Sequence, residues 1–326
     1  MLDPFGRSIE YLRLSITDRC NLRCRYCMPE EGVAPLGHGN ILSYEELLRV
    51  AHGCLALGIR KIRVTGGEPL VRRGVVDFIA RLAVLPGAPE IALTTNGLLL
   101  AEMAVPLKAA GLQRVNVSLD TLRPERFAAL TRRDGLEQVL AGLAAAEKAG
   151  LTPVKVNVIP LKGVNDDELL DFARLTLEHP WEVRFIEFMP ISSDLEYGNT
   201  DGVPIAEVER QLRTTGVLEP LPRQESAGPA RLFRIPGARG SLGLIPSVSG
   251  HFCPECNRLR VTADGRVRGC LFGNQEIDLK AALRGGGDDD ALIELLRAAV
   301  CAKPEKHAIG SPRFKTPNRR MHGIGG

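Results

Sequence analysis

The stretch LRLSITDRCNLRCRYC, residues 12–27, combines a short apolar run with three closely spaced cysteines. Cys20, Cys24 and Cys27 have the spacing C-x3-C-x2-C and follow the run directly. Three thiolates this close can hold one compact metal centre, but they cannot supply the four protein ligands of a structural zinc ion. A 4Fe–4S cluster held by three cysteines keeps one iron free for another ligand. The spacing therefore indicates a cluster that takes part in chemistry.

Two other interpretations of this triplet stay open at this point. One is a zinc knuckle, for which the nearest histidine is His38, eleven residues beyond Cys27. The other is a set of unrelated buried thiols, although core cysteines rarely occur as a triplet.

The bulk properties of the 326-residue chain restrict the class of protein. Its length allows a barrel-sized domain and a smaller one. A net charge of +3 predicts no general affinity for nucleic acid or membranes. The N-terminal residues show no signal-peptide pattern and no apolar run is long enough to span a membrane. We therefore expect a cytoplasmic protein, in which eight cysteines indicate metal or redox use rather than disulfides.

Strand-like and helix-like segments alternate along the first 190 residues. The strand-like segments are residues 12–17, 59–65, 90–95, 114–119, 153–159 and 182–187. The helical patterns are residues 43–57, 74–85, 102–110, 136–149 and 166–178, the first opening with a capping box from Ser43 to Glu46. Six such units predict an α/β fold with a parallel sheet, but they are too few for a closed barrel. We expect a partial (βα)6 barrel with its chemistry at the carboxyl ends of the strands.

The alternation ends near Pro190, and the segment 220–229 is typical of a linker. Later strand-like segments at 231–235, 241–245, 258–262 and 266–271 predict antiparallel pairs, with a hairpin turn at Asp264-Gly265. We therefore predict two domains, a partial barrel over residues 1–220 and a C-terminal α+β domain over residues 221–326.

A second cysteine triplet, Cys253, Cys256 and Cys270, lies in the predicted C-terminal domain with the spacing C-x2-C-x13-C. A zinc ribbon would need a fourth ligand, for which His251 is the obvious candidate. A second three-cysteine 4Fe–4S cluster explains the set equally well.

Basic residues in predicted strands indicate an anionic ligand. Alternation along a strand places Arg258 and Arg260 on one face beside the second triplet, where two guanidinium groups can bind phosphate. Arg13, Arg63 and Lys155 lie in three different predicted strands of the barrel. Charges inside a barrel need a partner, so these cations point to a polyanion such as a triphosphate. The pairs Arg132-Arg133 and Arg319-Arg320 are interpreted as solvated surface charge, with a role in guiding GTP as the alternative for the second pair.

The combined motifs resemble the GTP 3′,8-cyclases, the molybdenum cofactor biosynthesis protein A family of radical S-adenosylmethionine (SAM) enzymes. The resemblance covers nearly the whole chain. The motifs that carry it are the first cysteine triplet with Tyr26 before its last cysteine, the second triplet with Asn257-Arg258-Leu259-Arg260, and the terminal Gly325-Gly326.

The resemblance implies a role for each matching residue. Cys20, Cys24 and Cys27 would hold the 4Fe–4S cluster that binds SAM, and Cys253, Cys256 and Cys270 a second 4Fe–4S cluster whose open iron meets guanine. The implied SAM contacts are Tyr26, Gly67, Ser118 and Met189. The implied GTP contacts are Arg13, Arg63, Thr94, Lys155, Arg258, Leu259 and Arg260, with Arg258 and Arg260 also counted as catalytic. The Gly325-Gly326 tail would enter the active site.

The resemblance also implies a radical cyclisation. A 5′-deoxyadenosyl radical from SAM would take hydrogen from C3′ of GTP, and the ribose radical would close onto guanine C8. The product would pass to cyclic pyranopterin monophosphate synthase, an electron donor would be required, and the chain could form a homodimer. Competing interpretations are a radical SAM maturase acting on a peptide or RNA, and a zinc-containing binding module.

Overall fold

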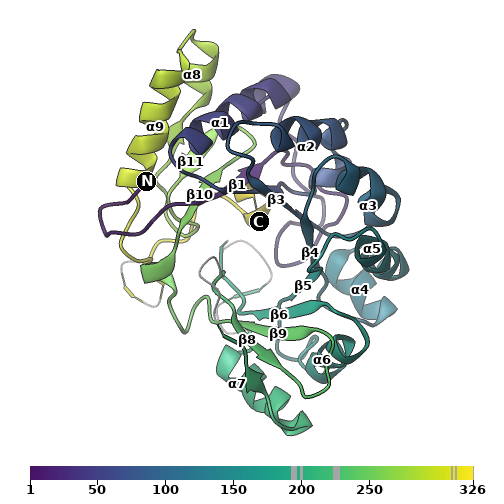
Figure 1. The fold of residues 1–326 in the computed structure, drawn as a ribbon. Helices are drawn as coiled ribbons and strands as arrows, with labels where there is room; N and C mark the ends of the chain where they lie inside the picture. The colour runs from purple at the N-terminus through teal and green to yellow at the C-terminus, as the bar shows by residue number, and fades with distance from the viewer. Residues whose placement is uncertain (192–196, 199–200, 223–227, 310, 313, 326) are drawn as a thin grey trace.

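A strongly curved sheet forms the centre of the molecule (Figure 1). The computed structural model describes residues 1–191, 197–198, 201–222, 228–309, 311–312 and 314–325. Six strands pair in parallel and in chain order through the middle of this sheet. They are β1 (Tyr11–Ser15), β2 (Lys61–Thr65), β3 (Glu90–Thr95), β4 (Arg114–Ser118), β5 (Lys155–Val158) and β6 (Glu182–Ile186). This order confirms the predicted partial barrel.

The helices that connect these strands lie outside the curve of the sheet (Figure 1). They are α1 (Tyr44–Ala56), α2 (Val75–Ala83), α3 (Leu100–Ala109), α4 (Pro124–Thr131), α5 (Leu136–Lys148) and α6 (Leu169–Glu178). The predicted capping box is present, because the Glu46 amide donates to Ser43 Oγ at 3.1 Å and the Ser43 amide donates to Glu46 Oε2 at 2.6 Å. Helix α4 was not predicted, since only eight residues form it and they show a weak apolar pattern.

The C-terminal strands extend both edges of the same sheet. Strand β9 pairs in parallel with β6, and β10 pairs in parallel with β1. The predicted antiparallel pairs are also present, as β8–β9 and β10–β11. The strands are β7 (Glu219–Pro220), β8 (Arg231–Arg234), β9 (Ser241–Ile245), β10 (Arg258–Val261), β11 (Arg266–Arg268) and β12 (Ile277–Asp278).

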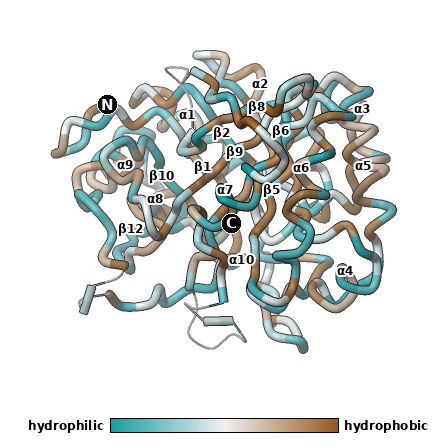
Figure 2. Tube along the Cα trace, turned by 90° about the horizontal axis from the view of Figure 1, so that it is seen from below, coloured by the Kyte–Doolittle hydropathy of each residue, from teal (hydrophilic) through white to brown (hydrophobic). Residues whose placement is uncertain are grey.

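Four further helices belong to this part of the chain: α7 (Ile205–Leu212), α8 (Lys280–Arg284), α9 (Asp289–Cys301) and the short α10 (Met321–Ile324). In the view of Figure 2, α10 and the C-terminus lie between the α8–α9 side and the α3–α6 side of the molecule. The predicted linker 220–229 includes residues 223–227, which lie outside the described residues. The division into two domains at residue 220 stays a prediction.

Alternation along the strands separates the core from the barrel interior. On β1, Leu12 and Leu14 are fully buried in the hydrophobic core, while Arg13 between them lines an internal cavity. Burying one such leucine stabilises the fold by about 1.5–3 kcal/mol. The apolar face thus holds the sheet against its helices and leaves the other face free for polar side chains. Among the described residues, no helix has the length and apolar character needed to cross a bilayer.

Candidate active site

A cavity of about 780 Å³ lies inside the open barrel, a size suited to small-molecule ligands. All six cysteines of the two triplets line this cavity. The side chains around it come from the barrel strands, from the loops after them and from β10. The structure therefore brings the two predicted centres together although more than 200 residues separate them in the sequence.

The first cysteine loop, residues 20–28, is attached to the end of α4. The amides of Arg23 and Arg25 donate to the carbonyls of Thr131 and Leu130, at 2.9 and 3.0 Å. The guanidinium of Arg132 donates to the carbonyls of Arg23 and Met28, both at 3.1 Å. The interpretation of Arg132 as solvated surface charge was therefore wrong, because it holds both halves of the loop.

The chemistry of the first triplet fits a positively charged iron–sulfur cluster. The thiols are free, and burial together with repulsion from Cys27 and Cys20 raises the pKa of Cys24 well above its usual value. Burial and the Cys20 charge raise the pKa of Cys27 to about 12. Three converging thiols with these pKa values become thiolates when iron supplies the compensating charge.

The loop after β2 approaches the cysteine loop very closely. A side chain on Gly67 would place its Cβ 2.4 Å from the carbonyl oxygen of Arg19, so only glycine fits there. The next residue, Glu68, is buried and accepts hydrogen bonds from the Leu70 amide, the Thr95 hydroxyl and the Asn96 amide at 3.0, 2.8 and 2.6 Å. Burial raises the pKa of Glu68 to about 7 despite these bonds. This carboxyl group links the ends of β2 and β3.

The four predicted SAM contacts all line the cavity that holds the first triplet: Tyr26, Gly67, Ser118 and Met189. The Tyr26 hydroxyl donates to Asp120, which also accepts a hydrogen bond from the Ile159 amide at 2.8 Å. Burial raises the pKa of Asp120 to about 6. Sequence reasoning missed Asp120 as a partner of Tyr26, although its place just after β4 pointed to the strand ends.

The second triplet is anchored from the far N-terminus of the chain. Arg7 forms a buried ion pair with Asp3 at 2.5 Å and donates to the Cys253 carbonyl at 2.8 Å. The ring of His251, the candidate zinc ligand, lies with its Nδ1 3.1 Å from His307 Nε2. Among the described residues, no group of three or more His, Cys, Asp or Glu converges on a single-ion site. Three free cysteines line the cavity at this site, and three cysteines are a ligand set that leaves one iron of a 4Fe–4S cluster open.

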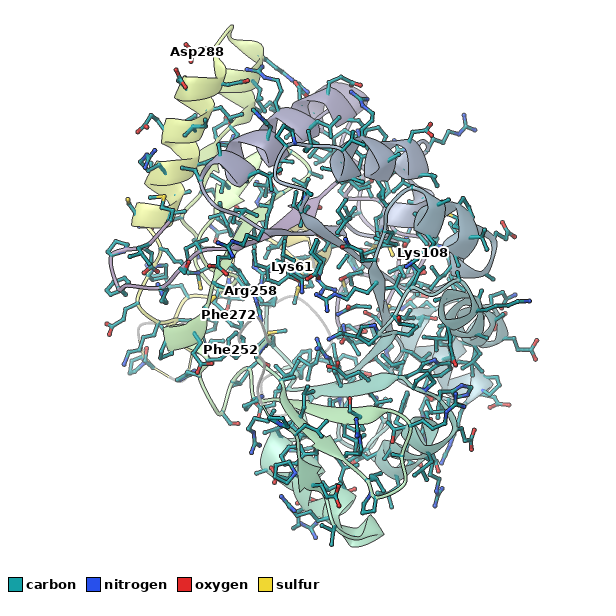
Figure 3. The ribbon with its side chains drawn as sticks, in the orientation of Figure 1. Lys61, Lys108, Phe252, Arg258, Phe272 and Asp288 are labelled. Atoms are coloured by element: carbon teal, nitrogen blue, oxygen red, sulfur yellow. The ribbon has the colours of Figure 1, made fainter. Side chains whose placement is uncertain are left out.

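Basic side chains dominate the walls of the cavity, and Figure 3 shows Lys61 and Arg258 beside the central opening. The basic lining residues are Arg13, Lys61, Arg63, Arg114, Lys155, Arg184, Arg234, Arg258 and Arg260, against the acidic Asp120 and Glu182. Every cation predicted from the strand pattern is therefore present. Four lining cations were missed: Lys61, Arg114, Arg184 and Arg234. Lys61 could have been found, because it lies two residues before Arg63 and therefore on the same face of the strand.

Crowding of these cations perturbs their ionisation. Lys155 pairs with Glu182 at 2.9 Å, yet burial and the neighbouring Arg184 lower the pKa of Lys155 to about 7. Burial also lowers the pKa of Lys61 to about 7. Burial and then Arg258 lower the pKa of Arg260 to about 10. The positive charge inside the cavity thus lacks enough protein counter-charge and favours a polyanionic ligand.

The remaining predicted contacts lie in different surroundings. Thr94 lines the cavity, and its hydroxyl accepts a hydrogen bond from Arg63 at 3.4 Å. The side chain of Leu259 is buried in the hydrophobic core and does not line the cavity. Arg319 forms ion pairs with Asp264 and Glu276 at 2.8 and 2.7 Å, so its interpretation as solvated charge was wrong.

The C-terminal tail reaches the cavity between β1 and β2, and Figure 1 shows the C-terminus within the opening. The Gly325 carbonyl accepts hydrogen bonds from Arg13 at 3.4 and 3.3 Å. A Cβ at Gly325 would lie 2.8 Å from both Ser15 Cβ and Thr65 Oγ1, and its φ of 87° also favours glycine. Gly326 lies outside the described residues.

Comparison with known proteins defines the class first. The Radical SAM superfamily model matches residues 14–176, and the Molybdenum Cofactor Synthesis C model matches residues 181–309. Streptococcus suis SuiB, solved with S-adenosylmethionine bound, shares the fold with a TM-score of 0.60 at 12% identity, covering 94% of this chain and 73% of SuiB. The fold and the first cysteine loop are therefore those of a radical SAM enzyme.

The sequence relatives are more specific. The GTP 3′,8-cyclase of Geobacter sulfurreducens is 51% identical over 326 residues, which cover 100% of this chain and 99% of the relative. The GTP 3′,8-cyclase of Moorella thermoacetica is 50% identical, with 100% of both chains covered. The chain belongs to the GTP 3′,8-cyclase family.

Proposed function

We propose that the chain is a GTP 3′,8-cyclase, which produces (8S)-3′,8-cyclo-7,8-dihydroguanosine 5′-triphosphate in the first step of molybdenum cofactor biosynthesis. One observation carries the proposal: a single cavity is lined by two three-cysteine sets and by a wall of basic side chains. The family relatives, about half identical over their full length, carry the name of this activity.

The first cysteine triplet is the proposed site of radical generation. Cys20, Cys24 and Cys27 hold a 4Fe–4S cluster, and the proposed SAM contacts are Tyr26, Gly67, Ser118 and Met189. When bound and reduced, this cluster supplies the electron that cleaves SAM to methionine and a 5′-deoxyadenosyl radical, which takes the C3′ hydrogen of GTP. Glu68 and Arg132 keep the loops around this site in place through the contacts described above.

The basic wall is the proposed GTP site. Arg13, Arg63, Lys155, Arg258 and Arg260 would bind phosphate oxygens through charge-assisted hydrogen bonds, with Thr94 as a neutral partner. Leu259 would contribute backbone contacts only, since its side chain lies in the core. Cys253, Cys256 and Cys270 hold the second 4Fe–4S cluster, whose open iron would bind guanine. Arg258 and Arg260, which line the same cavity, are also proposed as catalytic, as the family resemblance implies.

Fixation at two ends explains how this chain would direct the cyclisation. A triphosphate held by the strand cations and a base held at the second triplet leave the ribose between them, near the first triplet. The new bond joins C3′ to C8 of the same nucleotide, so no second substrate is needed. One electron and one proton then complete the reduction of the base. The tail at Gly325 fills space beside Arg13 and helps to exclude water from the radical.

The proposed reaction also sets the partners. Both SAM cleavage and reduction of the base consume electrons, so an external electron donor is required. The product would be taken up by cyclic pyranopterin monophosphate synthase, in keeping with the matched Molybdenum Cofactor Synthesis C model. A homodimer stays a prediction from the family resemblance.

An isotope experiment tests this function. The anaerobically reconstituted protein is incubated with SAM, a reductant and GTP deuterated at C3′, and the products are separated by chromatography before mass analysis. We expect deuterium in 5′-deoxyadenosine and an isomer of GTP that lacks deuterium. Cys24→Ala serves as the control and should form neither product. Formation of unlabelled 5′-deoxyadenosine with GTP unchanged would reject the proposed substrate.

A further inference from the structure

Lys303, just after α9, is a buried lysine whose ammonium group lies against the second cysteine triplet. The residue is 3% exposed. The ammonium donates to Cys256 Sγ at 3.3 Å, to the Arg258 carbonyl at 3.1 Å and to the Gly269 carbonyl at 2.6 Å. These acceptors use all three N–H donors. Among the described residues no carboxylate forms an ion pair with Lys303, so its charge acts on the thiol.

The position of Lys303 is fixed from both sides. Its own amide donates to the Val300 carbonyl at 3.2 Å, which continues the end of α9. The next two residues are held by Arg7, which donates to the carbonyls of Pro304 and Glu305 at 2.7 and 2.8 Å. A Cβ on Gly269 would lie 3.1 Å from Lys303 Cα, so the glycine permits this close approach. The ammonium group is thus held at the open end of the β10–β11 hairpin, between Arg258 at the start of β10 and Gly269 just after β11.

We infer that Lys303 is a positioning residue for the second cluster. Its ammonium group connects the chain segments that carry Cys256 and Cys270, and its N–H···S hydrogen bond to Cys256 withdraws electron density from the cluster. Hydrogen bonds to the sulfurs and nearby charge set the reduction potential of iron–sulfur clusters. A positive donor stabilises the reduced, more negative cluster and makes the open iron a stronger Lewis acid. The guanine contact that this would strengthen rests on the proposed function.

At the first triplet, Cys20 Sγ accepts from two neutral donors, the Leu22 amide at 3.4 Å and the Asn96 side chain at 3.9 Å. At the second triplet, Cys256 Sγ accepts instead from the ammonium group of Lys303 at 3.3 Å. The two thiols therefore have different hydrogen-bond donors, neutral ones at Cys20 and a cationic one at Cys256. A low potential suits the cluster that must reduce SAM, and a higher one suits a cluster that binds a base.

A redox titration followed by electron paramagnetic resonance tests this role. The full-length chain with Cys20, Cys24 and Cys27 all changed to alanine isolates the second cluster, and Lys303→Met removes the charge while keeping a long buried side chain. We expect the equilibrium for reduction of the cluster to fall at least tenfold, which is about 59 mV for one electron. Lys306→Met is the matched control, since this lysine is exposed three residues further on, and it should leave the potential unchanged. A Lys303→Met protein with an unchanged potential would overturn the inference.

Two further outcomes are separated by design. If Lys303→Met fails to retain the second cluster, Lys303→Gln takes its place, because it keeps a neutral donor. A lower potential in Lys303→Gln supports the proposed role of Lys303. Loss of the second cluster from both Lys303 variants, while Lys306→Met retains it, also supports this role. An unchanged potential in Lys303→Gln rejects it. All potentials are measured without nucleotide. A second-cluster signal that GTP fails to alter in the unsubstituted protein would count against the proposed guanine contact alone.

Discussion

Replacing Arg319 by alanine should release the C-terminal tail, residues 314–325, from the β10–β11 hairpin. Arg319 lies on the tail and donates to Asp264 Oδ1 and Oδ2 at 3.1 and 2.8 Å, and to Glu276 Oε1 and Oε2 at 2.7 and 2.9 Å. Asp264 lies in the turn of the hairpin and Glu276 just before β12. The guanidinium therefore connects the tail to the element that carries the proposed GTP arginines.

The loss is smaller than a sum over four bonds. A hydrogen bond to a charged group contributes about 1.5–3 kcal/mol, but Arg319 is 25% exposed, so water replaces part of this interaction. Both acceptors also keep another partner, because Glu276 still pairs with Arg268 and Asp264 still accepts from Thr262. We therefore expect the tail to lose about 2 kcal/mol of attachment, which is about 30-fold in its docked population.

Amide hydrogen exchange measures this change directly. Peptides from residues 314–325 should exchange about 30-fold faster in Arg319→Ala, while peptides from β1–β6 keep their protection. Lys315→Ala is the control, since Lys315 is an exposed residue on the same segment. Equal protection of the tail in Arg319→Ala and Lys315→Ala would refute the attachment. Equal deprotection across the barrel would instead show general destabilisation.

Three further predictions concern the proposed site. Arg258→Ala or Arg260→Ala should weaken GTP binding or turnover while SAM cleavage survives, and wild-type GTP kinetics in both would contradict the phosphate assignment. Cys24→Ala should abolish SAM cleavage, measured as 5′-deoxyadenosine, and retained cleavage would contradict the first cluster site. Lys61 and Lys155 have pKa values of about 7 in the free protein, so both are charged below that pH and largely neutral above it. A bound triphosphate favours the charged forms and therefore raises both pKa values. GTP affinity should therefore fall as the pH rises above about 7, with proton uptake on binding in calorimetry, and a pH-independent Kd would reject this.

The sequence contains the parts of the site that local spacing determines. Cysteine spacing predicted both triplets, because the members of each lie near one another along the chain. The alternation of side chains along a strand predicted that Arg13 faces the barrel interior, since Leu12 and Leu14 on either side face the core. Parallel order then places the strand ends together, so the loops at Gly67 and Ser118 were expected to meet.

The contacts that hold the site in place depend on tertiary structure instead. Arg132 is 104 residues from Met28, and Arg7 is 246 residues from Cys253. No sequence periodicity links residues so far apart. The local sequence around two adjacent arginines is also the same whether a guanidinium group is solvated or donates to a carbonyl. Lys303 is similar, because it follows the end of a helix and nothing in its neighbourhood identifies a thiol as its acceptor.

The crowding of cations in the barrel is best explained by binding and not by stability. Lys61 and Lys155 are mostly buried and have depressed pKa values, so their charged forms are disfavoured in the free protein. Each lysine has a carboxylate partner, Glu90 at 3.1 Å for Lys61 and Glu182 at 2.9 Å for Lys155. Each of these carboxylates is shared with an arginine, Glu90 with Arg114 and Glu182 with Arg184. A fold selected only for stability would supply more counter-charge, because buried charge without enough of it is destabilising. On β2, which carries Lys61, the opposite apolar face offsets the cost of the buried charge, because Ile62 and Val64 are fully buried in the core. An anion in the cavity would supply the missing counter-charge, so we expect the cavity to bind a triphosphate more tightly than a neutral nucleoside.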